Sequence, residues 1–133
     1  MHAYAAAGAF LESSYLRSVM ELQPTTLAGA RGIALRGELD LTGAPRIEEH
    51  VQSALLNGGG AFVLDLSELT FMDSTGVNAL LRTRSLLGRE GRDLVVVCPP
   101  GPVRRVLEII GVADMLAPFA SREQAAAALV PVD

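Results

Sequence analysis

Residues 69–76, with the sequence LTFMDSTG, place an acid, two hydroxyls and a glycine directly after a strand-like run and directly before a helix-like run. Ser74 could act as a nucleophile, and Asp73 could cap the helix by accepting hydrogen bonds from its first amide groups. The junction between a strand and the following helix is where α/β proteins bind ligands and partners. This segment is therefore the first candidate for a functional site.

The sequence lacks the other residues that an enzyme would need around this segment. A nucleophile elbow has a glycine two residues before the serine, where this chain has Met72. A serine nucleophile also needs a base, and the two histidines are His2, near the start of the chain, and His50, within a helix-like run. We expect a chain that is not an enzyme, with no catalytic residue, cofactor or metal.

Phosphate chemistry that depends on lysine is also excluded, because all 11 basic residues are arginine. A receiver-type phosphoaspartate at Asp65 relies on a lysine, and so does a P-loop. The three glycines at residues 58–60 are predicted to end a helix, with a phosphate cradle as the minor alternative. Cys98 is expected to be a small buried apolar residue, with redox sensing as the alternative.

Composition limits the class of protein. A chain of 133 residues, 50% of them hydrophobic, is long enough to form one domain with its own core. A single cysteine fits a reducing compartment, and a net charge of −4 without an arginine cluster argues against direct nucleic acid binding. No apolar run approaches the roughly 20 residues of a membrane-spanning helix, and no lysine or arginine precedes Arg17 to mark a secretory signal. We predict a cytoplasmic protein without membrane insertion.

The hydrophobic pattern alternates between strand-like and helix-like periods. Strands are predicted near residues 15–23, 31–39, 61–66, 94–98 and 115–119, with residues 24–30 as a long loop. Helices are predicted from the N-cap Thr42 to the glycines at residue 58, over residues 74–88 and 103–110, and after Ser121. This order predicts an α/β fold with a mixed central sheet of about five strands and about four helices. Residues 1–14 form an N-terminal extension, flexible or helical.

Several acidic and hydroxyl residues follow the predicted strands. Because the carboxyl ends of parallel strands meet the amino ends of the next helices, the sequence places them at one edge of the domain. The expected members of this edge are Asp40, Asp65, Asp73 and Ser74.

A purely structural interpretation of the same segment stays open. Asp73 can be the N-cap of the helix, with Met72 and Val77 in the positions of a hydrophobic staple. Such a cap does not explain why Phe71 and Met72 follow each other in a loop, nor why a second hydroxyl stands beside the first.

Two motifs resemble the STAS domain family, and more narrowly the bacterial anti-sigma factor antagonists. They are G-E-L-D at residues 37–40 and L-D-L-S-x-L-x-F-M-D-S-T-G at residues 64–76. The resemblance implies a single STAS-like domain over residues 15–130. It also implies that Ser74 matches the serine that the family's partner, both anti-sigma factor and kinase, phosphorylates. Asp40 matches a loop that contributes to partner contact in that family.

The function implied by this resemblance is partner switching. Unphosphorylated, the protein is expected to bind a GHKL-type anti-sigma factor and serine kinase and so release a sigma factor. Phosphorylation on Ser74 would end this binding, and a PP2C-type phosphatase would restore it. The expected partner surface consists of Asp40, Phe71, Met72, Asp73, Ser74 and Thr75. Burial of either Phe71 or Met72 beneath the helix is an equal expectation, and a STAS subunit of a transporter or a stress-signalling scaffold is the alternative function.

Overall fold

The computed structural model describes residues 20–129 of the chain, so the expected extension over residues 1–14 and the start of the expected first strand lie outside the described residues. One mixed sheet has the strand order β1-β2-β3-β4. The strands are β1 (Met20–Leu27), β2 (Ala30–Leu39), β3 (Phe62–Met72) and β4 (Leu94–Val97). Because β1 is antiparallel to β2 while β2, β3 and β4 are parallel, the predicted mixed α/β sheet is confirmed.

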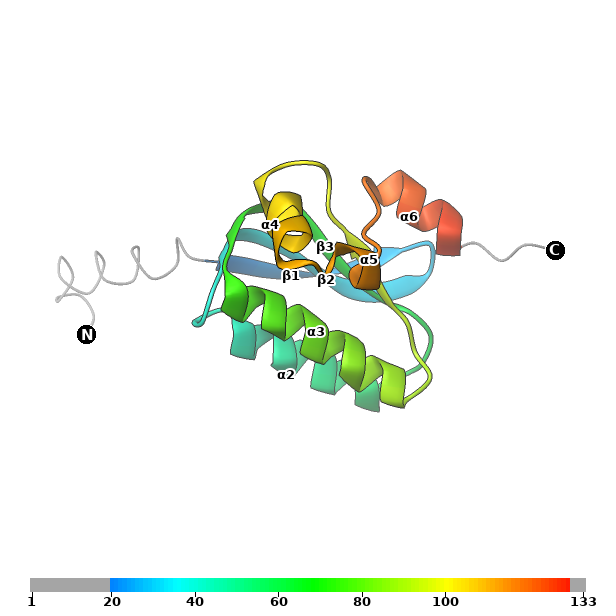
Figure 1. Cartoon of the computed structure of the whole chain (residues 1–133). Coiled ribbons are helices and arrows are strands. Elements are labelled where there is room, and N and C mark those ends of the chain that lie inside the picture. Colours follow the sequence, from blue (N-terminus) through cyan, green and yellow to red (C-terminus); the bar gives the residue numbers. More distant parts are fainter. Residues whose placement is uncertain (1–19, 130–133) are drawn as a thin grey trace, which may run out of the picture.

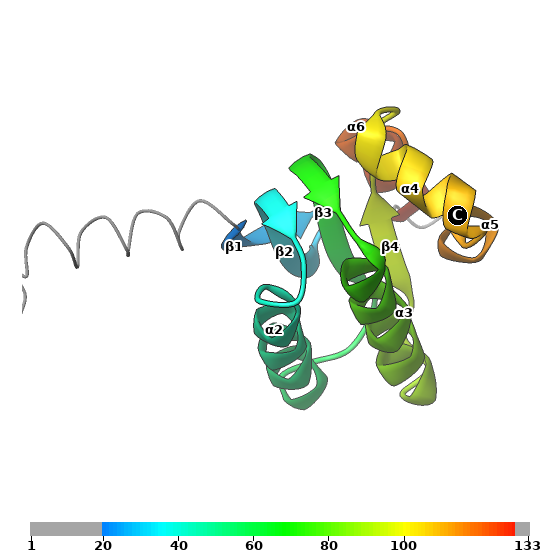
Figure 2. The ribbon, with the colours of Figure 1, turned by 60° about the vertical axis from the view of Figure 1, so that its left-hand side comes forward.

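Five helices accompany the sheet in the described part of the chain. They are α2 (Ala44–Leu56), α3 (Ser74–Arg89), α4 (Pro102–Ile110), α5 (Ala113–Leu116) and α6 (Arg122–Leu129). Figure 1 and Figure 2 show α2 and α3 side by side on one face of the sheet, whereas α4, α5 and α6 gather beyond β4. The parallel strands are thus joined by crossover helices, as the alternating sequence pattern predicts.

The first two strands form a hairpin, and the predicted long loop over residues 24–30 is wrong. Only Ala28 and Gly29 separate β1 from β2, and their φ angles of 50° and 84° are both positive, as in the type I′ turns that hairpins favour. Pro24 lies inside β1, paired with Ile33. A proline is tolerated there because β1 is the outer strand of the sheet and one of its sides needs no amide donors.

The predicted strand near residues 115–119 is also wrong. Helix α5 covers its first half, and Phe119 alone keeps a bridge, to Val97 of β4. Ala117 has a left-handed φ of 46°, and Pro118 follows it. This pair breaks the extended conformation that a strand needs, so the sheet has four strands and one added bridge rather than about five strands.

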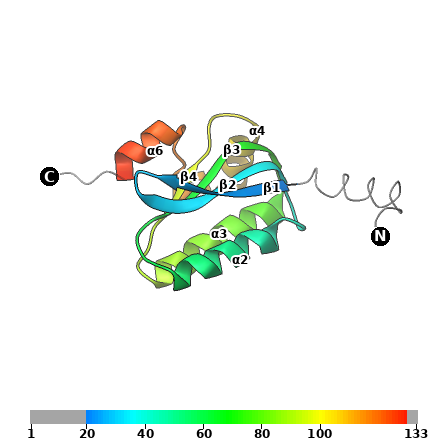
Figure 3. The ribbon, with the colours of Figure 1, turned by 180° about the vertical axis from the view of Figure 1, so that it is seen from behind.

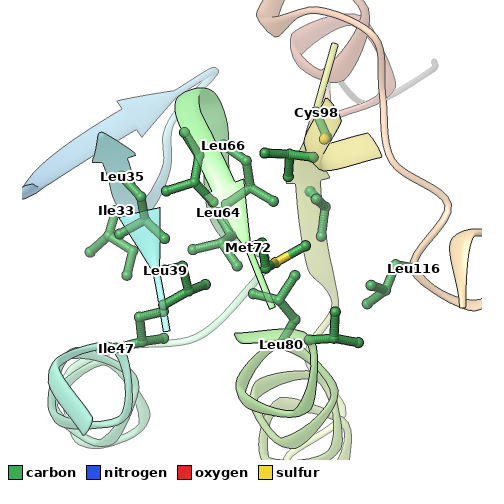
Figure 4. Packing of buried hydrophobic residues seen from close by; sticks show 14 of the residues in the cluster. Ile33, Leu35, Leu39, Ile47, Leu64, Leu66, Met72, Leu80, Cys98 and Leu116 are labelled. Atoms are coloured by element: carbon green, nitrogen blue, oxygen red, sulfur yellow. The ribbon is translucent and has the colours of Figure 1, made fainter. Parts of the chain in front are cut away.

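The main core lies between the sheet and the helices (Figure 4). Fully buried aliphatic side chains come from every layer, namely Ile33, Leu35 and Leu39 of β2, Leu64 and Leu66 of β3, Ile47 of α2 and Leu80 of α3. Burying each such side chain stabilises the fold by about 1.5–3 kcal/mol relative to exposure. A smaller cluster on the other face of the sheet, formed by Val63, Val97 and Ala125, is covered by α6.

Asp65 lies on the sheet face that α6 covers. The prediction that it lies at the same edge as Asp40, Asp73 and Ser74 is wrong. Strand β3 continues for seven residues beyond it, to Met72. The Asp65 carboxylate is buried, accepts a hydrogen bond from the Ser67 amide at 2.9 Å, and pairs with the Arg122 guanidinium at 2.7 Å. Asp65 therefore holds the start of α6 against the sheet.

Two smaller predictions are confirmed by the packing. Cys98 is buried with 1% of its surface exposed, and this burial raises the pKa of its thiol to about 11. A thiol with so high a pKa carries very little thiolate at neutral pH, which disfavours redox chemistry. Helix α2 ends at Leu56, just before the glycines at residues 58–60.

Candidate functional site

The ends of β2 and β3 meet the starts of α2 and α3 at one edge of the domain, on the left in Figure 1. The register pairs Leu39 with Met72, so Asp40 and Asp73 each follow one member of the same pair. The Asp73 amide also donates to the Leu39 carbonyl, at 3.4 Å. The fold therefore brings the expected residues Asp40, Asp73 and Ser74 to one edge.

Asp73 is the N-cap of α3. Its Oδ1 accepts hydrogen bonds from the Gly76 amide at 3.1 Å and from the Thr75 hydroxyl at 2.6 Å. The Thr75 hydroxyl is the largest cause of a lowered pKa of Asp73, and backbone amides lower it further, against the effect of burial. Met72 and Val77 are each 2% exposed, as a hydrophobic staple requires. The capping role predicted from sequence is thus confirmed, and Asp73 is ionised at neutral pH.

Gly76 is a residue whose importance the sequence reasoning missed. A Cβ atom at this position would lie 2.7 Å from Met72 Cγ and 2.8 Å from the Leu39 carbonyl oxygen. No side chain fits there, so the first turn of α3 packs directly on the end of β2. The signal in the sequence was a glycine in the first turn of a helix. Because glycine has a low helix propensity, its presence there indicates that close packing excludes a side chain. This close packing fixes the position of Ser74 relative to Asp40.

Ser74 is the first residue of α3 and is exposed. Its hydroxyl has no hydrogen-bond partner among the described residues, whereas the neighbouring Thr75 hydroxyl is engaged by Asp73 and is half-buried. The amino end of a helix carries a partial positive charge and free amide groups, which favour an anion. Ser74 can therefore receive a phosphate at a place where the fold tolerates the added charge.

The loop after β2 is held by Asp40 itself. Its Oδ1 accepts hydrogen bonds from the Thr42 amide at 3.0 Å and from the Thr42 hydroxyl at 2.8 Å, which is an Asx turn. The predicted N-cap role of Thr42 is wrong, because Gly43 precedes the helix without a side-chain cap and the Thr42 hydroxyl is used by Asp40. The turn leaves Leu41 with 72% of its surface exposed.

The two apolar residues before Asp73 differ in their exposure to solvent. Phe71 is 47% exposed, while Met72 is 2% exposed and lies in the core. They diverge because successive side chains of a strand point to opposite faces, and both belong to the end of β3. The expectation that Met72 faces a partner is therefore wrong. Besides Phe71, the exposed apolar side chain at this edge is that of Leu41 rather than Met72. The only sequence signal for the exposure of Leu41 was its position among polar loop residues.

We call the resulting set of residues the Ser74 surface: Asp40, Leu41, Phe71, Asp73, Ser74 and Thr75. It offers two carboxylates, two exposed apolar side chains and the Ser74 hydroxyl, which has no hydrogen-bond partner within residues 20–129. His50 lies elsewhere, on the wall of a groove that also includes residues 58–60. Between residues 20 and 129 there is no cluster of three or more His, Cys, Asp or Glu side chains able to hold a metal ion. In the same range no helix is long and apolar enough to cross a membrane.

Comparison with known proteins matches most of this chain to one family. The STAS domain profile matches residues 22–126. The anti-sigma-B factor antagonist of Staphylococcus aureus is 25% identical over 97 residues, which cover 73% of this chain and 90% of that protein.

Solved structures agree on the fold. An anti-sigma factor antagonist from Mycobacterium paratuberculosis has a TM-score of 0.74 at 24% identity, covering 84% of this chain and 95% of the other. The anti-sigma factor antagonist SpoIIAA in its unphosphorylated form has a TM-score of 0.67 at 23% identity, covering 85% and 100%. The murine anion transporter Slc26a9 also matches, with a TM-score of 0.70 at 15% identity over 95% of this chain and 24% of that chain. Because one fold serves both classes of protein, these structures alone do not separate their functions.

Proposed function

Because the chain belongs to the STAS domain family, we propose that it is an anti-sigma factor antagonist that binds an anti-sigma factor with serine kinase activity of the GHKL type. In its unphosphorylated form it would occupy the anti-sigma factor and release a sigma factor. Phosphorylation on Ser74 ends the interaction, and a PP2C-type phosphatase reverses it. The names of the similar proteins support the class of function, and one structural observation carries the proposal. Ser74 is exposed at the start of α3, and its hydroxyl has no hydrogen-bond partner in the described part of the chain.

The choice of Ser74 over Thr75 rests on hydrogen bonding. Thr75 Oγ1 donates to the Asp73 carboxylate at 2.6 Å, so transferring a phosphate to it would break this bond and place two anions side by side. A phosphate on Ser74 leaves the cap of α3 in place and extends toward solvent. The same modification on the neighbouring hydroxyl would destabilise the helix start.

The effect of the phosphate on binding follows from charge and desolvation. A phosphate adds a charge of about −1.5 to −2 beside Asp73, which is already ionised. In the free protein this charge stays hydrated and is favoured by the helix end. Docking a partner on Leu41 and Phe71 would remove water from it, and a buried charge without a partner costs several kcal/mol. The fold therefore survives phosphorylation while the complex does not.

The test is phosphorylation by candidate kinases encoded in the same genome, followed by intact-mass analysis and phosphopeptide mapping. We expect one phosphate on wild type, located on Ser74, and none on Ser74→Ala. The matched control is Thr75→Ser, which keeps the hydroxyl that Asp73 binds and should be modified like wild type. A phosphate located at position 75, or no modification by any GHKL-type kinase of the genome, contradicts the proposal.

A STAS subunit of a transporter is the second candidate, because the fold of this chain also matches part of an anion transporter. The two functions predict different partners for the Ser74 surface. Affinity purification that recovers a membrane permease, together with unaltered recovery from Leu41→Ser, would favour the transporter. Recovery of a kinase, lost in Leu41→Ser, favours the antagonist.

A further inference from the structure

A second candidate site lies at the opposite end of the sheet from the Ser74 surface. A groove of about 800 Å³ runs between the turn of the β1–β2 hairpin, the end of α2 and the start of β3. Figure 3 shows the hairpin turn and the loop after α2 at the same end of the molecule. Strand β3, with 11 residues, separates this end from Ser74 by roughly 30 Å. A ligand in the groove would leave the Ser74 surface free.

The charge of the groove differs from that of the whole protein. The chain has a net charge of −4, yet within residues 20–129 the charged side chains that line the groove are the guanidinium groups of Arg31 and Arg92. The imidazole of His50 lies on the same wall. No aspartate or glutamate of the described part of the chain lines it. Ser53 and Asn57 add polar side chains to the same wall. A concave surface with cations and no carboxylate favours an anion.

The glycine loop adds backbone donors. Among the described residues, the amides of Gly58, Gly59 and Gly60 have no hydrogen-bond acceptor. Gly58 and Gly60 need glycine for their positive φ angles of 133° and 83°, but Gly59 does not have a positive φ, and a Cβ there would meet nothing within 4 Å. Neither backbone conformation nor packing against residues 20–129 therefore requires glycine at position 59. A phosphate group approaching the backbone closely would require it.

The end of α2 would normally repel an anion, because the last carbonyl groups of a helix carry partial negative charge. Here two of the last four carbonyl groups, those of Ser53 and Ala54, accept hydrogen bonds from side chains. Arg92 donates to the carbonyls of Ala54 and Gly60, both at 2.8 Å, and the Asn57 side chain donates to the Ser53 carbonyl at 2.8 Å. Arg31, by contrast, forms no ion pair or side-chain hydrogen bond within residues 20–129. With respect to the described residues, its guanidinium is therefore available to a ligand.

We propose that this groove binds a small phosphorylated molecule, whose phosphate group accepts hydrogen bonds from the amides of the glycine loop and pairs with Arg31. Arg92 has a positioning role, because it ties the glycine loop to the end of α2. The site does not depend on the proposed antagonist function, since it uses other residues at the other end of the sheet.

Calorimetric titration of the full chain with inorganic pyrophosphate, and separately with ADP, at constant ionic strength tests the site. We expect saturable binding at one site for at least one probe, and Arg31→Gln should weaken it roughly tenfold or more, as the loss of a charge-assisted contact does. The matched control is Arg84→Gln, which removes the same charge from an exposed position of α3 outside the groove and should leave affinity unchanged. Equal weakening by both variants, or no saturable binding of either probe, overturns the proposal.

Amide chemical shifts locate the bound phosphate and separate this site from the Ser74 surface. In wild type, pyrophosphate should shift the amide signals of Gly58, Gly59 and Gly60 most strongly, and Ser74→Ala should bind the probe as wild type does. Shifts centred on residues 74–77 would instead place the anion at the start of α3 and overturn the groove. Loss of kinase binding in Ser74→Asp with unchanged pyrophosphate binding would show that the two sites work independently.

Discussion

Gly76 is where the close packing of the Ser74 surface can be tested most directly. We predict that Gly76→Ala lowers the free energy of unfolding, because the new methyl group would lie 2.7 Å from Met72 Cγ and 2.8 Å from the Leu39 carbonyl oxygen. The Met72 side chain can rotate away, but the carbonyl belongs to the backbone of β2 and cannot, so α3 must move outward. Overpacking of this kind costs typically about 1–3 kcal/mol.

Gly88→Ala is the matched control in the same helix. A Cβ at Gly88 meets nothing within 4 Å, and alanine is favoured over glycine in helices by up to about 1 kcal/mol. We therefore expect Gly88→Ala to raise the free energy of unfolding by about 0.5–1 kcal/mol. The two alanine variants should then differ by about 1.5–4 kcal/mol, although both make the same chemical change.

Urea denaturation followed by far-UV circular dichroism measures this difference, and thermal melts should separate the two variants by roughly 6–16 °C at about 4 °C per kcal/mol. The outward movement of α3 also displaces Ser74 from Asp40, so folded Gly76→Ala should be a poorer kinase substrate than Gly88→Ala. Equal denaturation midpoints for the two variants would refute the direct packing of α3 on β2.

The remaining predictions concern charge and apolar contact at the Ser74 surface. Ser74→Asp should keep or slightly raise the melting temperature, because a carboxylate at a helix start stabilises the helix by about 0.3–1 kcal/mol. The same variant should bind the kinase about a hundredfold more weakly in calorimetry, and wild-type affinity would contradict the charge argument. Leu41→Ser should weaken kinase binding while Leu56→Ser, at an even more exposed leucine of α2, should not; equal effects would remove Leu41 from the interface. The lowered pKa of Asp73 means that its cap stabilises the fold above the unfolded carboxyl pKa of about 3.9 and is lost as pH falls through the lower folded value. Asp73→Asn should therefore flatten the acid-side fall in melting temperature, and an acid profile identical to that of wild type would show that the cap contributes no such linkage.

The sequence alone predicted those features that depend on neighbours along the chain. The cap at Asp73 and its hydrophobic staple were predictable from the sequence because an N-cap acts within one helical turn. The end of α2 before Gly58, the burial of Cys98 and the alternation of strands and helices were readable for the same reason. These local signals suffice to predict an α/β fold with a candidate site at one edge.

The tertiary structure decided what depends on distant partners. Pro24 lies inside a strand because β1 is the outer strand of the sheet, and Asp65 lies away from the edge because pairing with β2 extends β3 to Met72. The same extension buries Met72 and exposes Phe71, which a run of two adjacent apolar residues could not settle. Leu41 became exposed through the Asx turn of Asp40, and Gly76 became essential through the backbone of β2. The sequence therefore determined where the candidate site lies, whereas strand pairing, which acts between residues far apart in the chain, decided which side chains it presents.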